Sequence, residues 1–405
     1  MSKRIFATNF WRQQDPAFST VYPPPTSTFS RAGSAYRHYP YGDETRLEEA
    51  ANDVLRCSWQ RNPDTGLWIR GAHLEPGRTN LLTLSTDLSS WGLSNSSITD
   101  SSIILPDGAE SDYDIIHEDN TPAAIHALYR GFGTVASSIY TVSAWYRAIN
   151  RSVAYLYLKA GIGITFDLIN GDILSSSGIV DYGMHYQGNG WWWCWCSFIS
   201  SGGTHYYRIY LCEDDGNYTF DGLDQDSMYI LWPQVEEGEF PSSRIDTAGA
   251  PVSRTQDSDY QVAAPLPAAK QGWLATKIYI TPHTNSAEIP LLTLSDGGSA
   301  TDRIRLAINT SQNLEVQSAC SGGDGGLVEA GSVMDGRAEG HDVYITWRPG
   351  ELCLALDGVF GTSDHVVSIP DNLDRLNIHP SGAIVGDVQI GDTFSRVPWR
   401  FLAAA

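Results

Sequence analysis

The sequence contains no run of 18 apolar residues, and its first residues, MSKRIFATNFWRQQ, include no apolar segment of the length that a signal peptide needs. The first absence excludes a transmembrane helix and predicts no membrane insertion. The second predicts synthesis in a cytoplasm, with lysis or particle assembly as the route to the outside. Repeats of 20–50 residues, heptads and collagen-like triplets are also absent, which excludes a long coiled-coil shaft.

Basic residues are scarce as well. The chain has 26 Lys and Arg against 47 Asp and Glu, a net charge of −21. The deficit is uneven, because residues 85–262 carry 7 basic and 23 acidic side chains whereas residues 1–84 carry 10 and 8. Nucleic-acid binders neutralise phosphates with a basic patch. We therefore expect no nucleic-acid partner, and the near-neutral front end suits an anchor on a larger assembly.

Common catalytic and metal-binding motifs are missing too. The sequence has no G-x-S-x-G, no H-E-x-x-H and no phosphate-binding G-x-x-x-x-G-K-[ST]. Its cysteines are irregularly spaced and include no pair of C-x-x-C motifs with zinc-like spacing. They are Cys57, Cys194, Cys196, Cys212, Cys320 and Cys353. We interpret them as buried free thiols and expect a protein that is not an enzyme and needs no organic cofactor.

The residues that are abundant favour β-structure. The chain has 13 Trp, 20 Tyr and 38 Gly, and aromatic residues favour strands while glycine favours turns. Short apolar or alternating stretches bounded by turn signals occur at 138–147, 152–159, 191–199, 206–212 and 228–235, and more follow residue 273. This spacing predicts an all-β protein with two β-sandwich, jelly-roll-like domains.

Four regions follow from this pattern. Residues 1–30 include three consecutive prolines, which predict an extended arm; the alternative is a disordered tail. Residues 31–84 predict a connector, in which 44–56 is the best helix candidate. Residues 85–262 predict a jelly roll and residues 263–405 a second sandwich with a hairpin at Asp357-Gly358. The arm would anchor the chain on a partner through its aromatic residues: Phe6, Phe10, Trp11, Phe18 and Tyr22.

Aromatic residues in the jelly roll are candidates for glycan binding. Trp and Tyr rings stack on the flat C–H faces of sugars while a polar tip remains free to hydrogen-bond. In a strand, Trp191, Trp193 and Trp195 would share one face, with Cys194 and Cys196 on the other. Tyr206 and Tyr207 are further candidates. The alternative is that these side chains serve packing, on one face against the core or a neighbouring subunit.

The densest acidic cluster is Glu213, Asp214 and Asp215, followed by Gly216. Oxygen ligands in a loop could hold Ca²⁺, although the spacing does not fit the twelve-residue calcium loop. The alternatives are a solvated turn and a catalytic carboxylate pair.

Two sets of motifs resemble known proteins. The first runs from Asn52 to Trp91 and includes Glu75-Pro76-Gly77-Arg78-Thr79-Asn80-Leu81-Leu82. It resembles the preamble of many phage tail-fibre, head-spike and minor structural proteins. The second ends in Trp232-Pro233-Gln234-Val235-Glu236-Glu237-Gly238-Glu239-Phe240-Pro241-Ser242 and looks like the carbohydrate-binding-module-type jelly roll that follows this preamble. The last 140 residues are similar in pattern to concanavalin-like or laminin-G-like sandwiches.

The resemblance implies a structural subunit on the surface of a phage or phage-like particle: a head spike, decoration protein or tail fibre. It would contact other virion proteins through the arm and attach to host-surface polysaccharide. A homotrimer is favoured and a pentamer is the alternative, since such assemblies are cyclic. The competing hypotheses are a free or secreted carbohydrate-binding protein and a polysaccharide depolymerase.

Overall fold

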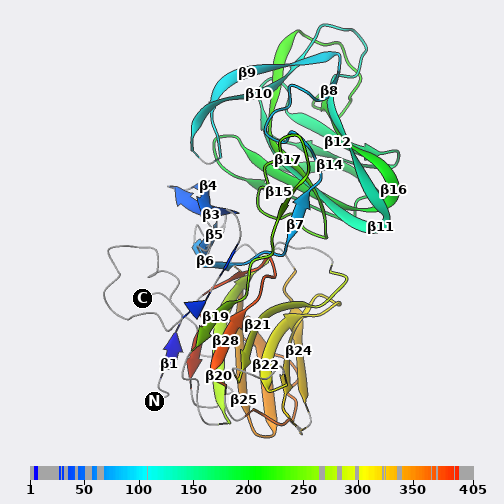
Figure 1. Cartoon of the computed structure of the whole chain (residues 1–405). Coiled ribbons are helices and arrows are strands. Elements are labelled where there is room, and N and C mark those ends of the chain that lie inside the picture. The colour runs from blue at the N-terminus through cyan, green and yellow to red at the C-terminus, as the bar shows by residue number, and fades with distance from the viewer. Residues whose placement is uncertain are drawn as a thin grey trace. The chain divides into compact units, whose positions relative to one another are not determined.

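The computed structural model describes residues 4–7, 27–28, 30–31, 35–41, 44–50, 57–61, 68–106, 108–263, 270–280, 285–296, 301–321, 323, 325–334, 340–365, 367–370, 373–386 and 388–391. Within these ranges the chain is all-β, as predicted, and the structure contains no helix suited to crossing a membrane. The chain divides into two compact units (Figure 1). Unit 1 comprises Met1–Arg37, Ala50–Pro76 and Thr255–Ala405, and unit 2 comprises His38–Glu49 and Gly77–Arg254.

Unit 1 is a sandwich of two antiparallel sheets. The larger sheet has the order β27 (Val359–Phe360), β26 (Glu351–Leu356), β25 (His341–Arg348), β20 (Gly272–Tyr279), β29 (Ile384–Val385), β6 (Trp68–His73), β5 (Cys57–Arg61), with β30 (Gln389–Gly391) beside β20 and β1 (Arg4–Ala7) beside β30. The smaller sheet has the order β2 (Ser27–Thr28), β19 (Tyr260–Ala263), β28 (Arg375–Ile378), β21 (Ile289–Ser295), β22 (Arg303–Ile308), β23 (Asn313–Ala319), β24 (Gly326–Ser332).

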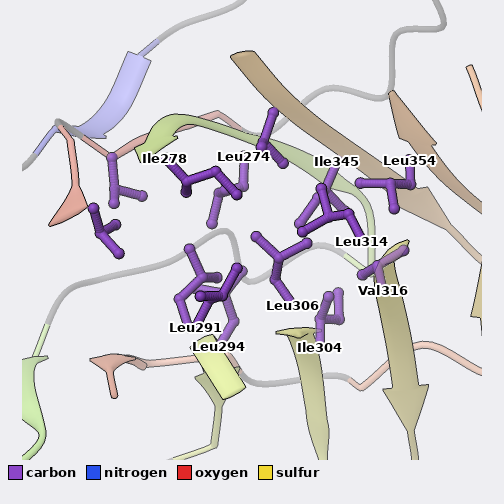
Figure 2. Close-up of a cluster of buried hydrophobic side chains, with 14 of the residues drawn as sticks. Leu274, Ile278, Leu291, Leu294, Ile304, Leu306, Leu314, Val316, Ile345 and Leu354 are labelled. Atoms are coloured by element: carbon purple, nitrogen blue, oxygen red, sulfur yellow. The ribbon is translucent and has the colours of Figure 1, made fainter. Parts of the chain in front are cut away.

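The core of unit 1 lies between these sheets. In β22, Ile304, Leu306 and Ile308 are buried while Arg303 and Arg305 are partly exposed, so the period-2 alternation turns one face inward. Figure 2 shows Ile304 and Leu306 on the side of the core opposite Leu274 and Ile345 of the larger sheet.

Unit 2 is built on one ten-stranded sheet with the order β14 (Asp172–Ser177), β13 (Ile162–Asp167), β12 (Val153–Lys159), β16 (Trp192–Cys212), β11 (Ala127–Ala148), β17 (Gln225–Glu237), β10 (Glu110–Glu118), β9 (Ser96–Ile104). Two more strands pair beside this path, β15 (Asp181–Tyr186) with β16 and β8 (Gly92–Ser94) with β11. A small separate ladder joins β7 (Arg78–Asn80) to β18 (Val252–Arg254).

Two long strands divide this sheet into two layers. The first half of β11 pairs with the second half of β16, and these halves carry β8 and β12. The remaining halves pair with each other and carry β15 and β17. The pairing is interrupted between Ala136 and Ile139, whose partners in β16 are Ser201 and Ile199, and Gly202 and Gly203, which follow Ser201 in β16, both have positive φ. We call the first half of β11 and the second half of β16, with β8, β12, β13 and β14, the tyrosine layer. We call the remaining halves of β11 and β16, with β15, β17, β10 and β9, the tryptophan layer.

The core of unit 2 is formed by side chains of both layers. Leu128, Phe132 and Ile209 of the tyrosine layer share one buried cluster with Val142 and Phe198 of the tryptophan layer. The two layers therefore face each other as a sandwich.

The structure overturns one prediction about elements, joins two predicted strands into one and confirms a hairpin. The predicted helix at 44–56 is wrong for Glu44–Ala50, which is β4 and pairs with β3 (Ala35–Tyr41). A helix of this length is marginal in water, and strand pairing overrides its weak propensity. The two stretches 191–199 and 206–212 are one continuous strand, β16, rather than two. The hairpin at Asp357-Gly358 is confirmed, and both residues have positive φ, which this tight turn requires.

Candidate functional site

Most of the predicted tryptophan site is buried. Trp191 has no exposed surface, and its indole N–H donates to the Ile104 carbonyl over 2.9 Å. Trp195 is 1% exposed, and a Cβ on Gly183 would lie 2.4 Å from its indole nitrogen. Trp193 is partly buried and stacks on Trp145, with ring centroids 5.7 Å apart. Neither Trp191 nor Trp195 presents a ring face to a ligand, because the tryptophan layer uses both for packing.

Tyr206 and Tyr207 point to opposite faces of β16. Tyr207 lies fully inside the core, where its hydroxyl forms a hydrogen bond with the hydroxyl of Tyr146. Burial raises the pKa of Tyr207 above its usual range. A glycan-binding role for Tyr207 is therefore incompatible with this structure. Tyr206 is 36% exposed on the outer face of the tyrosine layer.

The outer face of this layer carries a continuous group of tyrosines. Its rows follow from strand pairing: Arg208 of β16 lies between Tyr129 of β11 and Tyr157 of β12. In the next row Tyr210 lies beside Tyr155. We define the tyrosine face as the six tyrosines around Arg208: Tyr129, Tyr155, Tyr157, Tyr206, Tyr210 and Tyr218.

The rings of the tyrosine face support one another. Tyr218, which follows β16, stacks on Tyr155 and Tyr210 with centroid distances of 5.7 and 5.3 Å. Tyr129 meets Tyr206 edge-on at 6.4 Å. Such stacking fixes ring orientation before any ligand arrives, and side chains that are already ordered lose little entropy on binding.

Two glycines at neighbouring strands let the rings lie flat on the sheet. A Cβ on Gly92 of β8 would lie 2.4 Å from the ring of Tyr129, and a Cβ on Gly163 of β13 would lie 2.7 Å from the ring of Tyr155. Real Cβ atoms do not approach other atoms this closely, so side chains at these positions would displace the rings. A ring that lies along the sheet can present its face, which is the part that stacks on a sugar.

Arg208 occupies the centre of the tyrosine face. Its guanidinium carbon lies 4.6 Å from the ring centroid of Tyr129 and 5.1 Å from that of Tyr206. Nη1 donates a hydrogen bond to the hydroxyl of Tyr210 over 3.2 Å. The face therefore combines stacking surfaces, phenol hydroxyls and one cation, which suits recognition of a polar ring-shaped ligand.

The predicted cation ligands lie next to this face in the loop after β16. Asn217 donates from its side chain to Glu213 over 3.0 Å and from its backbone to Asp215 over 2.9 Å. Asp214 accepts from Ser152 over 2.9 Å. Among the described residues no three His, Cys, Asp or Glu side chains converge to hold a metal ion. A calcium site in this loop stays a prediction.

Of the predicted anchoring residues, only Phe6 is described. It belongs to β1, which pairs with β30 in unit 1. This part of the predicted arm is thus a strand of a sandwich. Phe10, Trp11, Phe18 and Tyr22 lie outside the described residues.

The two motifs that carry the family resemblance meet in unit 2. Asn80 is fully buried, and its side-chain nitrogen donates to the Ile245 carbonyl over 2.9 Å. Its side-chain oxygen accepts from the backbone N–H groups of Leu82 and Val235, both over 3.1 Å. The first motif is therefore bonded directly to the second, which contains Val235.

The second motif continues this network. Gln234 accepts from the Ile245 backbone over 2.7 Å, and the buried Glu236 accepts from the backbone and hydroxyl of Ser242. Burial raises the pKa of Glu236, and the Ser242 hydrogen bonds oppose that rise. We call Asn80, Gln234, Glu236 and Ser242 the clasp. The clasp is a structural element, since its side chains are buried and bond to backbone groups.

The sequence contains the signal for the tyrosine face, although the tyrosine face was not predicted as a unit. The alternation Y-x-R-x-Y in 206–210 and Y-x-Y in 155–157 places all five side chains outward once the opposite residues enter the core. The missing information was which strands are neighbours, because two of the six tyrosines lie outside these stretches: Tyr129 in β11 and Tyr218 in the loop after β16.

Comparisons with known proteins give weak similarities. No protein-family model matches the chain, and no curated protein matches its sequence. Domains LG4-5 of the mouse laminin alpha1 chain are 13% identical with a TM-score of 0.22, covering 64% of this chain and 85% of that one. Trypanosoma rangeli sialidase is 8% identical with a TM-score of 0.27, covering 89% and 60%. Fructosyltransferase from A. japonicus is 12% identical with a TM-score of 0.24, covering 90% and 68%. The chain is similar to each of these only as an all-β protein.

Proposed function

We propose that this chain is a non-enzymatic surface subunit of a phage or phage-like particle, and that unit 2 attaches it to host-surface glycans through the tyrosine face. The observation that carries the attachment role is the set of six tyrosines around Arg208 on one outer face. Mounting on a particle is supported by the motif resemblance alone. Homo-oligomerisation and contacts to other virion proteins belong to this same proposal.

The attachment role is tested by binding of the purified chain to an array of bacterial surface glycans. Tyr206→Ala and Tyr157→Ala each remove one ring of the face, and we expect each to weaken binding of a recognised glycan about fivefold, since a stacked ring contributes about 1 kcal/mol. Tyr182→Ala is the matched control, because Tyr182 is 48% exposed on β15 of the tryptophan layer. Equal losses in all three variants would contradict the assignment of the tyrosine face.

The particle role is tested by electron microscopy of particles labelled with an antibody against residues 263–405. Label on the capsid would identify a head spike or decoration protein, and label at the tail a fibre. Particles without label would refute the virion hypothesis and leave a free carbohydrate-binding protein. Release of reducing ends from a bound polysaccharide would refute the non-enzymatic part and support a depolymerase.

A further inference from the structure

Among the residues that the structure describes, Arg208 has no carboxylate partner. Within the described part of the chain it forms no ion pair, its Nη1 donates to a tyrosine hydroxyl, and its Nε is buried without a hydrogen-bond partner. Other arginines of the chain are paired: Arg151 with Glu118 over 2.8 Å, and Arg348 with Glu351 over 2.5 Å. Acidic residues are not in short supply, because residues 85–262 contain 23 of them. Arg208 is therefore unpaired although acidic residues are available, and among the described residues Arg130, which donates to Thr83 and Ser90, forms no ion pair either.

An unpaired guanidinium among rings is incompletely satisfied. Ring faces attract the cation, but they accept none of its planar N–H donors. A carboxylate matches these donors in geometry and charge, and such pairs are frequently bidentate. A carboxylate brought by a ligand would supply the partner that the fold leaves out.

We propose that Arg208 binds the carboxylate of an acidic sugar, so that the tyrosine face recognises carboxylated glycans such as those containing uronic acids. This inference rests on the proposed function and specifies its ligand. Tyr129 and Tyr157 flank Arg208 in the same row, and neighbouring strands are about 4.8 Å apart. A sugar ring stacked on Tyr157 would therefore bring an exocyclic carboxylate within reach of the guanidinium, whereas the ring of Tyr129 already has the guanidinium over it.

The test uses the full chain on an array that contains carboxylated, sulfated, phosphorylated and neutral glycans. The carboxylated member that binds best is then compared with its methyl ester, which keeps the sugar and removes the charge. We expect esterification to lower affinity at least tenfold for the wild type. Arg208→Gln should lower affinity for the free acid to a similar extent and should not respond to esterification, because the two changes remove the same interaction. Arg208→Lys should retain part of the affinity.

The outcomes separate this inference from the proposed function. If neutral, sulfated or phosphorylated glycans bind best, or if the methyl ester binds as well as the acid, the inference is wrong while the attachment role stands. If no glycan binds, both are wrong. Arg147→Gln, a partly buried arginine of β11 in the tryptophan layer, is the control and should bind normally. If Arg208→Gln does not fold, the comparison of acid and ester on the wild type still decides.

Discussion

Replacement of Asn80 tests whether the clasp stabilises unit 2. Asn80→Ala removes an acceptor from two backbone N–H groups, at Leu82 and Val235, and a donor from the Ile245 carbonyl. The site has no exposed surface, so the freed groups gain no solvent. A buried group that loses its partner costs about 1–3 kcal/mol, and partial relaxation reduces the sum over three groups to about 3–5 kcal/mol. Such a loss is a large share of a domain's typical stability of about 5–15 kcal/mol.

Asn80→Asp separates the hydrogen bonds from the volume of the side chain. The carboxyl oxygen that replaces Oδ1 can still accept from Leu82 and Val235, but the ionised second oxygen faces the Ile245 carbonyl and repels it. A protonated carboxyl would donate to that carbonyl instead. The pKa of the new group is therefore raised in the folded state, so its contribution is favourable below about pH 4 and is lost as the pH rises.

The assay is denaturant unfolding followed by tryptophan fluorescence at pH 4 and pH 8, with each variant compared to the wild type at the same pH. Asn150→Ala is the control, because the side chain of Asn150 is exposed and makes one hydrogen bond, to the Asp226 carbonyl over 2.7 Å. The control should cost less than about 1 kcal/mol. A cost for Asn80→Ala no larger than the control's, or an Asn80→Asp cost that is the same at both pH values, would refute the reasoning.

Three further predictions concern stability. Burial, with the charges of Asp100 and Asp87 as smaller contributions, raises the pKa of Asp114 from 3.8 to about 6. The ionised form therefore destabilises the folded state above pH 6, and this cost disappears below pH 4. In a urea titration, Asp114→Asn should stabilise the protein by about 1–2 kcal/mol at pH 8 and leave its stability unchanged at pH 4. Tyr207→Phe leaves the Tyr146 hydroxyl buried without this partner and should cost about 1–2 kcal/mol in the same titration, while the double variant with Tyr146→Phe should recover part of it. Leu306→Ala in unit 1 should lower stability by about 2–5 kcal/mol through the cavity it leaves, and a thermal midpoint equal to that of the wild type would contradict the core assignment.

Much of the fold could be predicted from local sequence, because aromatic alternation and turn residues act over a few positions. The hairpin at Asp357-Gly358 is an example, since the two residues themselves adopt the positive φ values of the turn. The single strand β16 could not be predicted, because its bend at Gly202 and Gly203 reads as a turn in sequence. Whether two glycines end a strand or continue it depends on the partner strand, here β11, whose Thr134 still pairs with Gly203 and whose Ala136 pairs with Ser201.

The candidate site was predicted less well, for a related reason. The tryptophans at 191–195 were predicted to bind a glycan, yet Trp191 and Trp195 are buried, because large apolar rings contribute most to stability when they are covered. Tyr206 and Tyr207 were both predicted to bind a glycan, but Tyr206 is partly exposed and Tyr207 is buried, because the alternation of a strand places them on opposite sides. The inward side was fixed by Ile209 and Leu211, which join the core together with Tyr207.

The location of the clasp bears on what the family resemblance can imply. The clasp residues of both motifs are buried and bond to backbone groups, so we assign them a role in closing the sandwich. The tyrosine face lies on strands other than those of the clasp, and five of its six tyrosines are outside both sets of motifs, whereas Tyr210 and Arg208 belong to the second set. Proteins that share the clasp can therefore share a fold and still carry different outer faces. The resemblance supports mounting and architecture, whereas glycan specificity has to be argued from Arg208 and the rings around it.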